Sequence, residues 1–269
     1  MKRLLLILAL AMLVPARTSW AQLAPPNQMG VAMGHVHLIV QDVDTYTKFF
    51  MTLGAAPTSH MNGVKFPGVV ILFRKGDPSG PAVGTVIGHF GFHVPDTKAA
   101  LDRWSAAGLK TEVGPNPGQG FVYTPDNLIR IEILEDKTLT VPIAFHHIHY
   151  FVPERGPGGA SGVKEIQAWY AQVFGAKPGM RAQFEAADLP GVNLTFSQSD
   201  TPTKKIEGSV IDHIGFDMTD LEGFCKKESA LGVKFDSPCT KDPNKPLFTI
   251  YLTDPWGTKI ELTNDLRTF

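Results

Sequence analysis

Four histidines stand at the same place in four similar strings of the sequence. The strings HVHLIVQD, HFGFHVPD, HIHYFVPE and HIGFDMTD begin at His35, His89, His147 and His213. Near neutral pH an imidazole can bind a metal ion or transfer a proton. Because the surrounding apolar and acidic positions also match, the pattern indicates that these four side chains share one structural role.

A second histidine follows two of these four positions. His37 comes two residues after His35, and His149 comes two residues after His147. Side chains two apart in a strand lie on the same face of a sheet. The second histidines could therefore transfer protons or hold a substrate beside the first ones, or they could pack in the core.

Each histidine string opens a repeat unit of about 50 residues. Apolar residues at helical spacing follow each string, a glycine ends each helical stretch, and strand-like runs close each unit at 69–73, 129–134, 192–196 and 259–262. The sequence therefore predicts an α+β fold of four units. A unit of this size has an unpaired sheet edge and should pair with a neighbour. We expect two domains, 34–136 and 145–265, separated by residues 137–144.

The composition excludes several classes of protein. The chain has 269 residues, of which 43% are hydrophobic and 19% charged, which is typical of a globular protein. Its net charge is −1 and it has no run of Lys or Arg, so a nucleic-acid partner is not expected. Two cysteines are too few for a disulfide scaffold. Cys225 and Cys239 could be bonded to each other or remain free thiols.

The first 21 residues have the pattern of a secretory signal peptide. Lys2 and Arg3 precede an apolar run at 4–14, and Ser19 and Ala21 are small residues placed for a signal peptidase. Cleavage after Ala21 takes the net charge from −1 to −4. We expect a periplasmic or secreted protein without a membrane anchor. An uncleaved N-terminal anchor is the alternative.

These features resemble the vicinal oxygen chelate superfamily, which contains glyoxalase I, extradiol dioxygenases and bleomycin-resistance proteins. The resemblance is carried by the four H-x-x-[LFY] strings, by WYAQVFGAKPG at 169–179 and by DPWGTKIEL at 254–262. It implies four βαβββ modules, paired into two cupped half-open barrels that hold a divalent metal. One or two ions would be bound. Fe(II) or Mn(II) is favoured, and Zn or Ni is possible.

The family pattern also implies the metal ligands. In that family the first strand of a module can supply a His and the last strand a Glu. Each expected domain then supplies two histidines and one glutamate: His35, His89 and Glu132 in the first, and His147, His213 and Glu261 in the second. The alternative is that the glutamates are merely solvated and that the histidines stabilise strand edges.

The resemblance further implies catalytic roles for Tyr251, His149 and His37. Tyr251 begins the Y-x-x-D-P-x-G motif of extradiol dioxygenases, but the histidine that usually precedes it is missing at 242–244. The first specific expectation is an extradiol-type dioxygenase acting on a small molecule through two neighbouring oxygens. A glyoxalase I-like lyase or isomerase, or a non-enzymatic binder of small molecules, is the alternative. The protein would be a monomer or a homodimer.

Overall fold

The computed structural model describes residues 22–59, 61–243, 247–264 and 266. The predicted signal peptide, residues 1–21, lies outside this part of the chain. Within the described residues, no helix is long and apolar enough to cross a membrane.

The described chain consists of four similar modules, as the repeat predicts. The first contains β1 (Val31–Val40), α1 (Val43–Leu53), β2 (Ala56–Pro57), β3 (Gly63–Phe66) and β4 (Val69–Lys75). The second contains β5 (Ile87–Val94), α2 (Thr97–Ala106), β6 (Thr111–Val113), β7 (Gln119–Tyr123) and β8 (Arg130–Glu135). The third contains β9 (Ala144–Val152), α3 (Gly162–Phe174), β10 (Lys177–Arg181), β11 (Phe184–Leu189) and β12 (Val192–Gln198). The fourth contains β13 (Ile211–Met218), α4 (Leu221–Ala230), β14 (Thr249–Thr253) and β15 (Lys259–Asn264).

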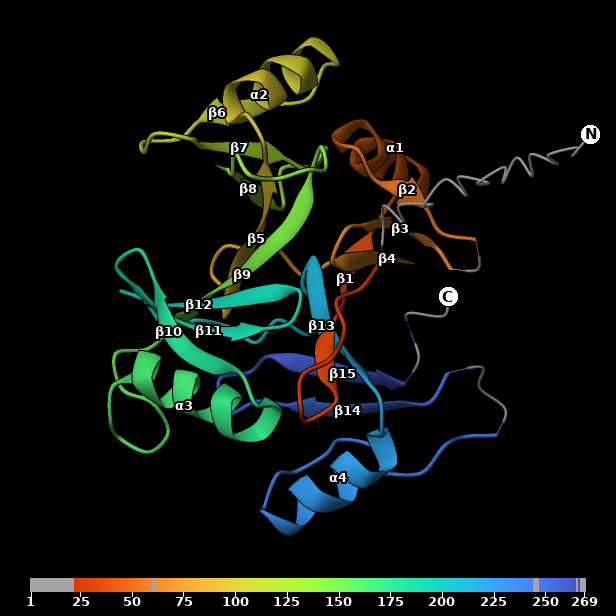
Figure 1. Cartoon of the computed structure of the whole chain (residues 1–269), viewed down its shortest axis with the longest axis vertical. Coiled ribbons are helices and arrows are strands. Elements are labelled where there is room, and N and C mark those ends of the chain that lie inside the picture. Colours follow the sequence, from red (N-terminus) through yellow and green to blue (C-terminus); the bar gives the residue numbers. More distant parts are fainter. Residues whose placement is uncertain (1–21, 60, 244–246, 265, 267–269) are drawn as a thin grey trace, which may run out of the picture.

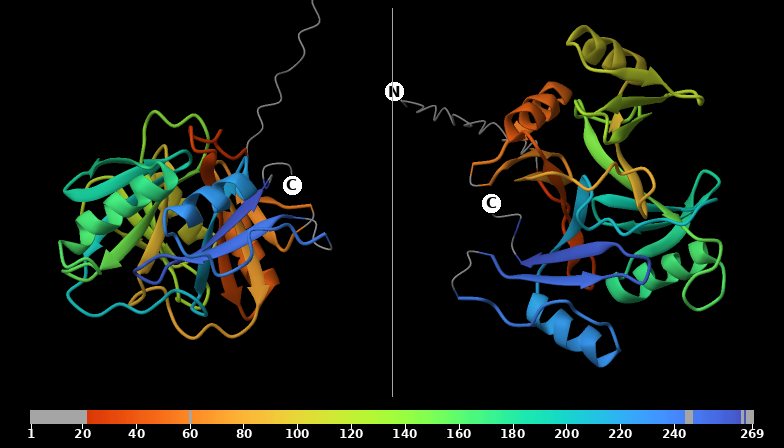
Figure 2. Two further views of the ribbon diagram at one scale, coloured as in Figure 1. Left: turned by 90° about the horizontal axis from the view of Figure 1, so that it is seen from below. Right: turned by 180° about the vertical axis from the view of Figure 1, so that it is seen from behind.

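The helices form where apolar residues recur at helical spacing. In α1 the buried residues are Tyr46, Phe49, Phe50 and Leu53, which make one face. Aspartate side chains accept hydrogen bonds from the first backbone N–H groups of α1, α2 and α4. The helices lie at the outside of the molecule, and the strands lie between them (Figures 1 and 2). The α+β class and the content of each module are confirmed.

The modules pair in a different way from the one that the sequence led us to expect. One sheet has seven strands in the order β14-β15-β13-β1-β4-β3-β2, and the other has eight in the order β10-β11-β12-β9-β5-β8-β7-β6. The first module therefore pairs with the fourth through β1 and β13, and the second pairs with the third through β5 and β9. The expected pairing within 34–136 and within 145–265 is wrong.

The connections explain this pairing. The link between β4 and β5 and the link between β12 and β13 cross from one sheet to the other side by side, with Ser79 N donating to Gly208 O at 2.8 Å and Val86 N donating to Lys204 O at 2.9 Å. The link at 137–144, which we expected to separate two domains, instead joins two modules of one sheet. A free strand edge can pair with any complementary edge, so sequence neighbours have no intrinsic advantage.

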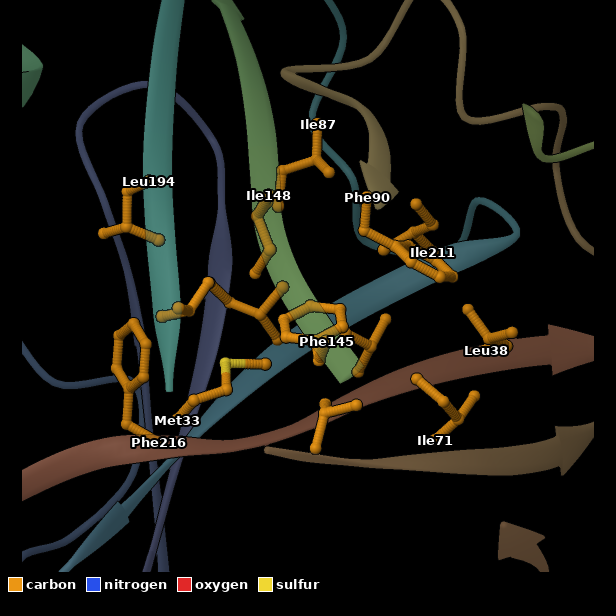
Figure 3. Close-up of a cluster of buried hydrophobic side chains, with 14 of the residues drawn as sticks. Met33, Leu38, Ile71, Ile87, Phe90, Phe145, Ile148, Leu194, Ile211 and Phe216 are labelled. Carbon is orange, nitrogen blue, oxygen red and sulfur yellow. The ribbon is translucent and has the colours of Figure 1, made fainter. Parts of the chain in front are cut away.

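The main hydrophobic core lies between the two sheets. Figure 3 shows Met33 and Leu38 of β1 facing Phe90 of β5 and Phe145 and Ile148 of β9. Since side chains alternate along a strand, His37, His89 and His147, which are next to Leu38, Phe90 and Ile148, point to the opposite face of each sheet. At the outside of the molecule, a disulfide joins Cys225 of α4 to Cys239.

Candidate metal centres

Cluster A is formed by His35, His37, His213 and Glu261. It lies where the first and fourth modules meet, on β1, β13 and β15. One possible ligand atom from each residue lies within 4.8 Å of the others. Glu261 Oε2 is 3.3 Å from His35 Nε2 and 2.9 Å from His213 Nε2. A single carboxylate oxygen therefore faces two imidazole nitrogens in a buried place.

Cluster B is formed by His89, Glu132, His147 and His149. It repeats the same arrangement where the second and third modules meet, on β5, β8 and β9. Glu132 Oε2 is 3.5 Å from His89 Nε2 and 2.8 Å from His147 Nε2. His147 is completely buried. The two clusters thus have the same kinds of ligand from corresponding strands.

The structure brings together different ligands from those we expected. The expected sets were His35, His89 and Glu132, and His147, His213 and Glu261. Instead His35 lies with His213 and Glu261, and His147 lies with His89 and Glu132. All six residues do lie in a cluster. The sets are exchanged because β1 pairs with β13 and β5 pairs with β9.

Two glycines make room for the imidazoles. A side-chain carbon added at Gly215 would lie 2.0 Å from the ring of His35, and one added at Gly91 would lie 2.3 Å from the ring of His147. Each glycine is also the direct partner of that histidine in the ladder between the two first strands. A His-x-His strand therefore needs a His-x-Gly strand beside it.

The donor atoms of both clusters suit a divalent metal. Both ring nitrogens of His35 and of His37 are buried and make no hydrogen bond with acceptable geometry. The same is true of Nε2 of His89 and of His147. Buried polar atoms nearly always have a partner, so a converging group of unpartnered nitrogens indicates that a cation belongs there. Two neutral imidazoles and one carboxylate are the donors that such a cation needs.

The protonation states in the clusters also favour a metal. Burial, together with the charges of neighbouring histidines, lowers the pKa of His37 to about 3 and the pKa of His149 to about 2. Burial alone would raise the pKa of Glu132 and Glu261, but the imidazoles facing them lower both below the ordinary value. At neutral pH His37 and His149 are therefore neutral and both carboxylates are ionised, as metal ligands must be. Burial lowers the pKa of His213, but Asp212 and Glu261 raise it above the ordinary value, so this ring would lose its proton when a metal binds.

The three residues expected to be catalytic lie in different clusters. His37 and Tyr251 lie in or beside cluster A, where the Tyr251 ring is 5.9 Å from the ring of His213. His149 lies in cluster B, and its Nε2 is 2.7 Å from Ser197 Oγ. We expected Tyr251 and His149 to serve one site, so this part of the expectation is wrong. The cause is again the exchange of modules between the sheets.

Four residues that the sequence did not single out contact the clusters. Asp212 Oδ2 lies 2.8 Å from His213 Nδ1, and His146 Nδ1 lies 3.0 Å from His147 Nδ1. Gln119 donates from its side-chain amide to Glu132, and Arg181 Nη2 lies 3.7 Å from the same carboxylate. In a regular strand His146 would point to the opposite face from His147, because the two residues are adjacent. A register shift between β5 and β9 at this point turns it toward its neighbour instead.

Comparison with known proteins supports the resemblance seen in the sequence. Residues 160–262 match the model of the Glyoxalase/Bleomycin resistance protein/Dioxygenase superfamily. Glyoxalase I from Zea mays has a TM-score of 0.69 at 16% identity, over 88% of this chain and 94% of that chain. A mutant of the maize enzyme has a TM-score of 0.68 at 16% identity, over the same shares of both chains. No curated protein matches the sequence.

Proposed function

Because residues 160–262 belong to the Glyoxalase/Bleomycin resistance protein/Dioxygenase superfamily and nearly the whole chain has the fold of glyoxalase I, we propose that this protein is a divalent-metal-dependent enzyme. It would bind a small substrate through two neighbouring oxygen atoms. The observation that carries the proposal is the pair of buried clusters, each with two imidazoles facing one carboxylate and with buried ring nitrogens that have no hydrogen-bond partner.

The residues that would hold the metals follow from the geometry. His35, His213 and Glu261 would hold one ion, and His89, His147 and Glu132 a second one. Two nitrogen donors and one oxygen donor suit Fe(II) or Mn(II) and also accept Zn or Ni. A bound ion supplies positive charge that polarises the substrate oxygens.

The side chains of His37, His149 and Tyr251 can form hydrogen bonds with a substrate. His37 and His149 are neutral at pH 7, and their low pKa makes them weak bases, so each would hold a bound substrate by hydrogen bonds and not by taking its proton. Burial, followed by the charge of Glu261, raises the pKa of Tyr251, so its hydroxyl stays protonated and can donate a hydrogen bond to a substrate oxygen. Each cluster thus has a neutral imidazole beside the metal ligands, and cluster A also has a phenol hydroxyl that can donate a hydrogen bond.

The number of carboxylates favours one reaction class. β4 places Val70 beside His35 and Leu72 beside His37, and β12 places Asn193 and Thr195 at the corresponding positions of cluster B. Neither strand brings a second carboxylate into its cluster. Two histidines and one carboxylate with open positions are typical of iron oxygenases. An extradiol-type dioxygenase is therefore the first class to test.

Two alternatives remain part of the proposal. The extent of the likeness to glyoxalase I favours a lyase or isomerase of that kind. A non-enzymatic binder of small molecules has the same fold, because function resides in the site and not in the fold. We infer a complete monomer as the working unit, since both clusters are assembled within one chain; a homodimer is the alternative.

A reconstitution experiment separates these classes. The purified protein is loaded with Fe(II), Mn(II), Ni(II) or Zn(II), analysed for metal, and assayed for oxygen uptake with catechol and for turnover of the methylglyoxal–glutathione hemithioacetal. We expect oxygen uptake by the Fe(II) protein and none in the Glu132→Gln, Glu261→Gln double variant. Hemithioacetal turnover alone would favour the glyoxalase class. Metal binding without turnover would favour the binder, and failure to bind any metal would contradict the whole proposal.

We further propose that the protein is exported. Support comes from the signal-like pattern of residues 1–21 and from the disulfide between Cys225 and Cys239, because disulfides persist in oxidising compartments. Determination of the mature N-terminus from the periplasmic fraction tests this. Cleavage after Ala21 is the expected result, and an intact N-terminus in the cytoplasm would contradict it.

A further inference from the structure

Clusters A and B have the same kinds of ligand, but a cation lies next to only one of the two ligating carboxylates among the described residues. Arg181 of β10 approaches cluster B, with Nη2 3.7 Å from Glu132 Oε2 and a side chain that is 18% exposed. Its Nε donates to Thr195 Oγ1 at 2.7 Å, and Thr195 Oγ1 donates to Asn193 Oδ1 at 2.7 Å. The guanidinium is therefore fixed in orientation, with Nη2 directed at Glu132.

The corresponding place in cluster A is apolar. The residue paired with His149 is Thr195, whereas the residue paired with His37 is Leu72. Leu72 packs in a small hydrophobic cluster around Leu23, Val70 and Leu266. This patch offers a substrate no charged group.

The charged residue added beside cluster A is negative, whereas the one added beside cluster B is positive. Asp212 adds a second carboxylate, since it lies 2.8 Å from His213. Arg74 is 56% exposed at its side chain and places Nη2 3.5 Å from Asp212 Oδ1. A divalent ion in cluster A would therefore be largely neutralised by the protein. In cluster B the positive charge of Arg181 balances the negative charge of Glu132. A divalent ion bound there would therefore keep excess positive charge.

A cavity of about 620 Å³ reaches cluster B at His89. Phe151 forms part of its wall and stacks on the ring of His149, with 4.7 Å between the ring centres and an angle of 15°. Arg130 lines the same cavity and lies 3.9 Å over the ring of Phe121. A cavity of this size suits a small organic molecule. A ligand that entered it would meet the imidazole of His89, an aromatic wall and the guanidinium of Arg130.

We propose that cluster B is the substrate-binding site and that its substrate is a small organic acid, whose carboxylate contacts Arg181 and whose adjacent oxygen completes the chelate. This inference rests on the proposed function, because it needs a metal in cluster B. A carboxylate is favoured because its two oxygens match the planar guanidinium fork. Cluster A would hold its metal without taking the acid, since its surroundings are apolar and already carry two carboxylates.

The test compares three small probes on Mn(II)-loaded protein, with binding followed by the relaxation of water protons. Glycolate has a hydroxyl beside a carboxylate, hydroxyacetone is its neutral counterpart, and inorganic phosphate is an anion of another shape. We expect Arg181→Gln to retain Mn(II) but to bind glycolate about 10- to 100-fold more weakly, as loss of a charged hydrogen bond does. Binding of hydroxyacetone should be unchanged.

Matched variants locate the effect. Arg74→Gln removes the cation beside cluster A and should leave glycolate binding unchanged. Glu132→Gln should abolish glycolate binding, and Glu261→Gln should retain it. The inference is overturned if Arg181→Gln holds metal and binds glycolate as tightly as the wild type, if phosphate binds more tightly than glycolate, or if Glu261 and not Glu132 is required. A wild-type protein without metal would instead overturn the proposed function.

Discussion

At the scale of single residues, the two clusters differ in the group that orients a ligating histidine. The second nitrogen of His213 faces the carboxylate of Asp212, whereas the second nitrogen of His147 faces the imidazole of His146. A carboxylate behind a ligating histidine fixes its tautomer and raises its basicity, and its loss commonly weakens metal binding by about 10- to 100-fold. Cluster A should therefore bind a metal more tightly than cluster B.

This difference predicts the effect of Asp212→Asn. In a Glu132→Gln background, where only cluster A is complete, the substitution should weaken metal binding by about 10- to 100-fold. Competition with a chelator of known affinity measures the change. His146→Gln in the same background is the matched control and should have no effect. Equal affinities with and without Asp212 would show that this carboxylate does not orient a metal ligand.

At the scale of the elements, two tyrosines connect the sheets. Tyr46 of α1 donates to Asp126, in the loop between β7 and β8 of the opposite sheet, at 2.8 Å. Tyr170 of α3 donates to Asp254, in the turn between β14 and β15 of the opposite sheet, at 2.9 Å. Each aspartate lies in the turn that leads into the strand with a ligating glutamate. These helices therefore help to position the glutamate strands of the neighbouring sheet.

Removal of one hydroxyl tests this connection. Tyr170→Phe removes the donor to Oδ2 of the buried Asp254, while Oδ1 keeps the N–H groups of Trp256 and Thr258, and should lower the free energy of unfolding by about 1–3 kcal/mol. Tyr46→Phe is the matched control. It should cost less, because Asp126 is exposed and water can replace the lost donor. Urea denaturation measures both variants, and equal losses would contradict the argument.

The same turn predicts a pH dependence. Burial raises the pKa of Asp254 above its ordinary value of 3.8, although hydrogen bonds from Thr258 and Tyr170 oppose the rise. The folded state therefore holds this proton more tightly than the unfolded state. Its contribution to stability is complete below pH 3.8 and is lost as the pH rises through the folded-state pKa.

Asp254→Asn removes this titration. Denaturation of both proteins from pH 3.5 upward should show a wild type that loses stability relative to the variant as the pH rises above 3.8. A difference between the two proteins that stays constant with pH would contradict the raised pKa.

At the scale of the whole molecule, the sequence predicted the modules but not their partners. The four histidine strings, the buried helix faces and the two glutamates all lie in the expected elements. The complementarity of His-x-His and His-x-Gly strands is also visible in the sequence. It permits β1 to pair with either β5 or β13, because both carry the glycine. Whether β1 pairs with β5 or with β13 depends on how the two long links cross between the sheets. Local sequence patterns do not predict these crossings.

The residues around the clusters were missed for a related reason. Arg181 reaches Glu132 only because β10 lies in the same sheet as β8, and nothing near Arg181 in the sequence marks it. Asp212 directly precedes His213, but adjacent residues in a regular strand point to opposite faces. Tertiary pairing and local irregularity therefore decide which side chains surround the clusters.

The central claim is that His35 serves the same metal as Glu261 and not the same metal as Glu132. Metal content of the reconstituted wild type, of His35→Gln, and of two double variants tests it directly. We predict two equivalents for the wild type and one for His35→Gln. One equivalent of metal should also remain in the His35→Gln, Glu261→Gln double variant. None should remain in the His35→Gln, Glu132→Gln double variant. The claim is contradicted if the His35→Gln, Glu132→Gln variant retains one equivalent of metal and the His35→Gln, Glu261→Gln variant retains none.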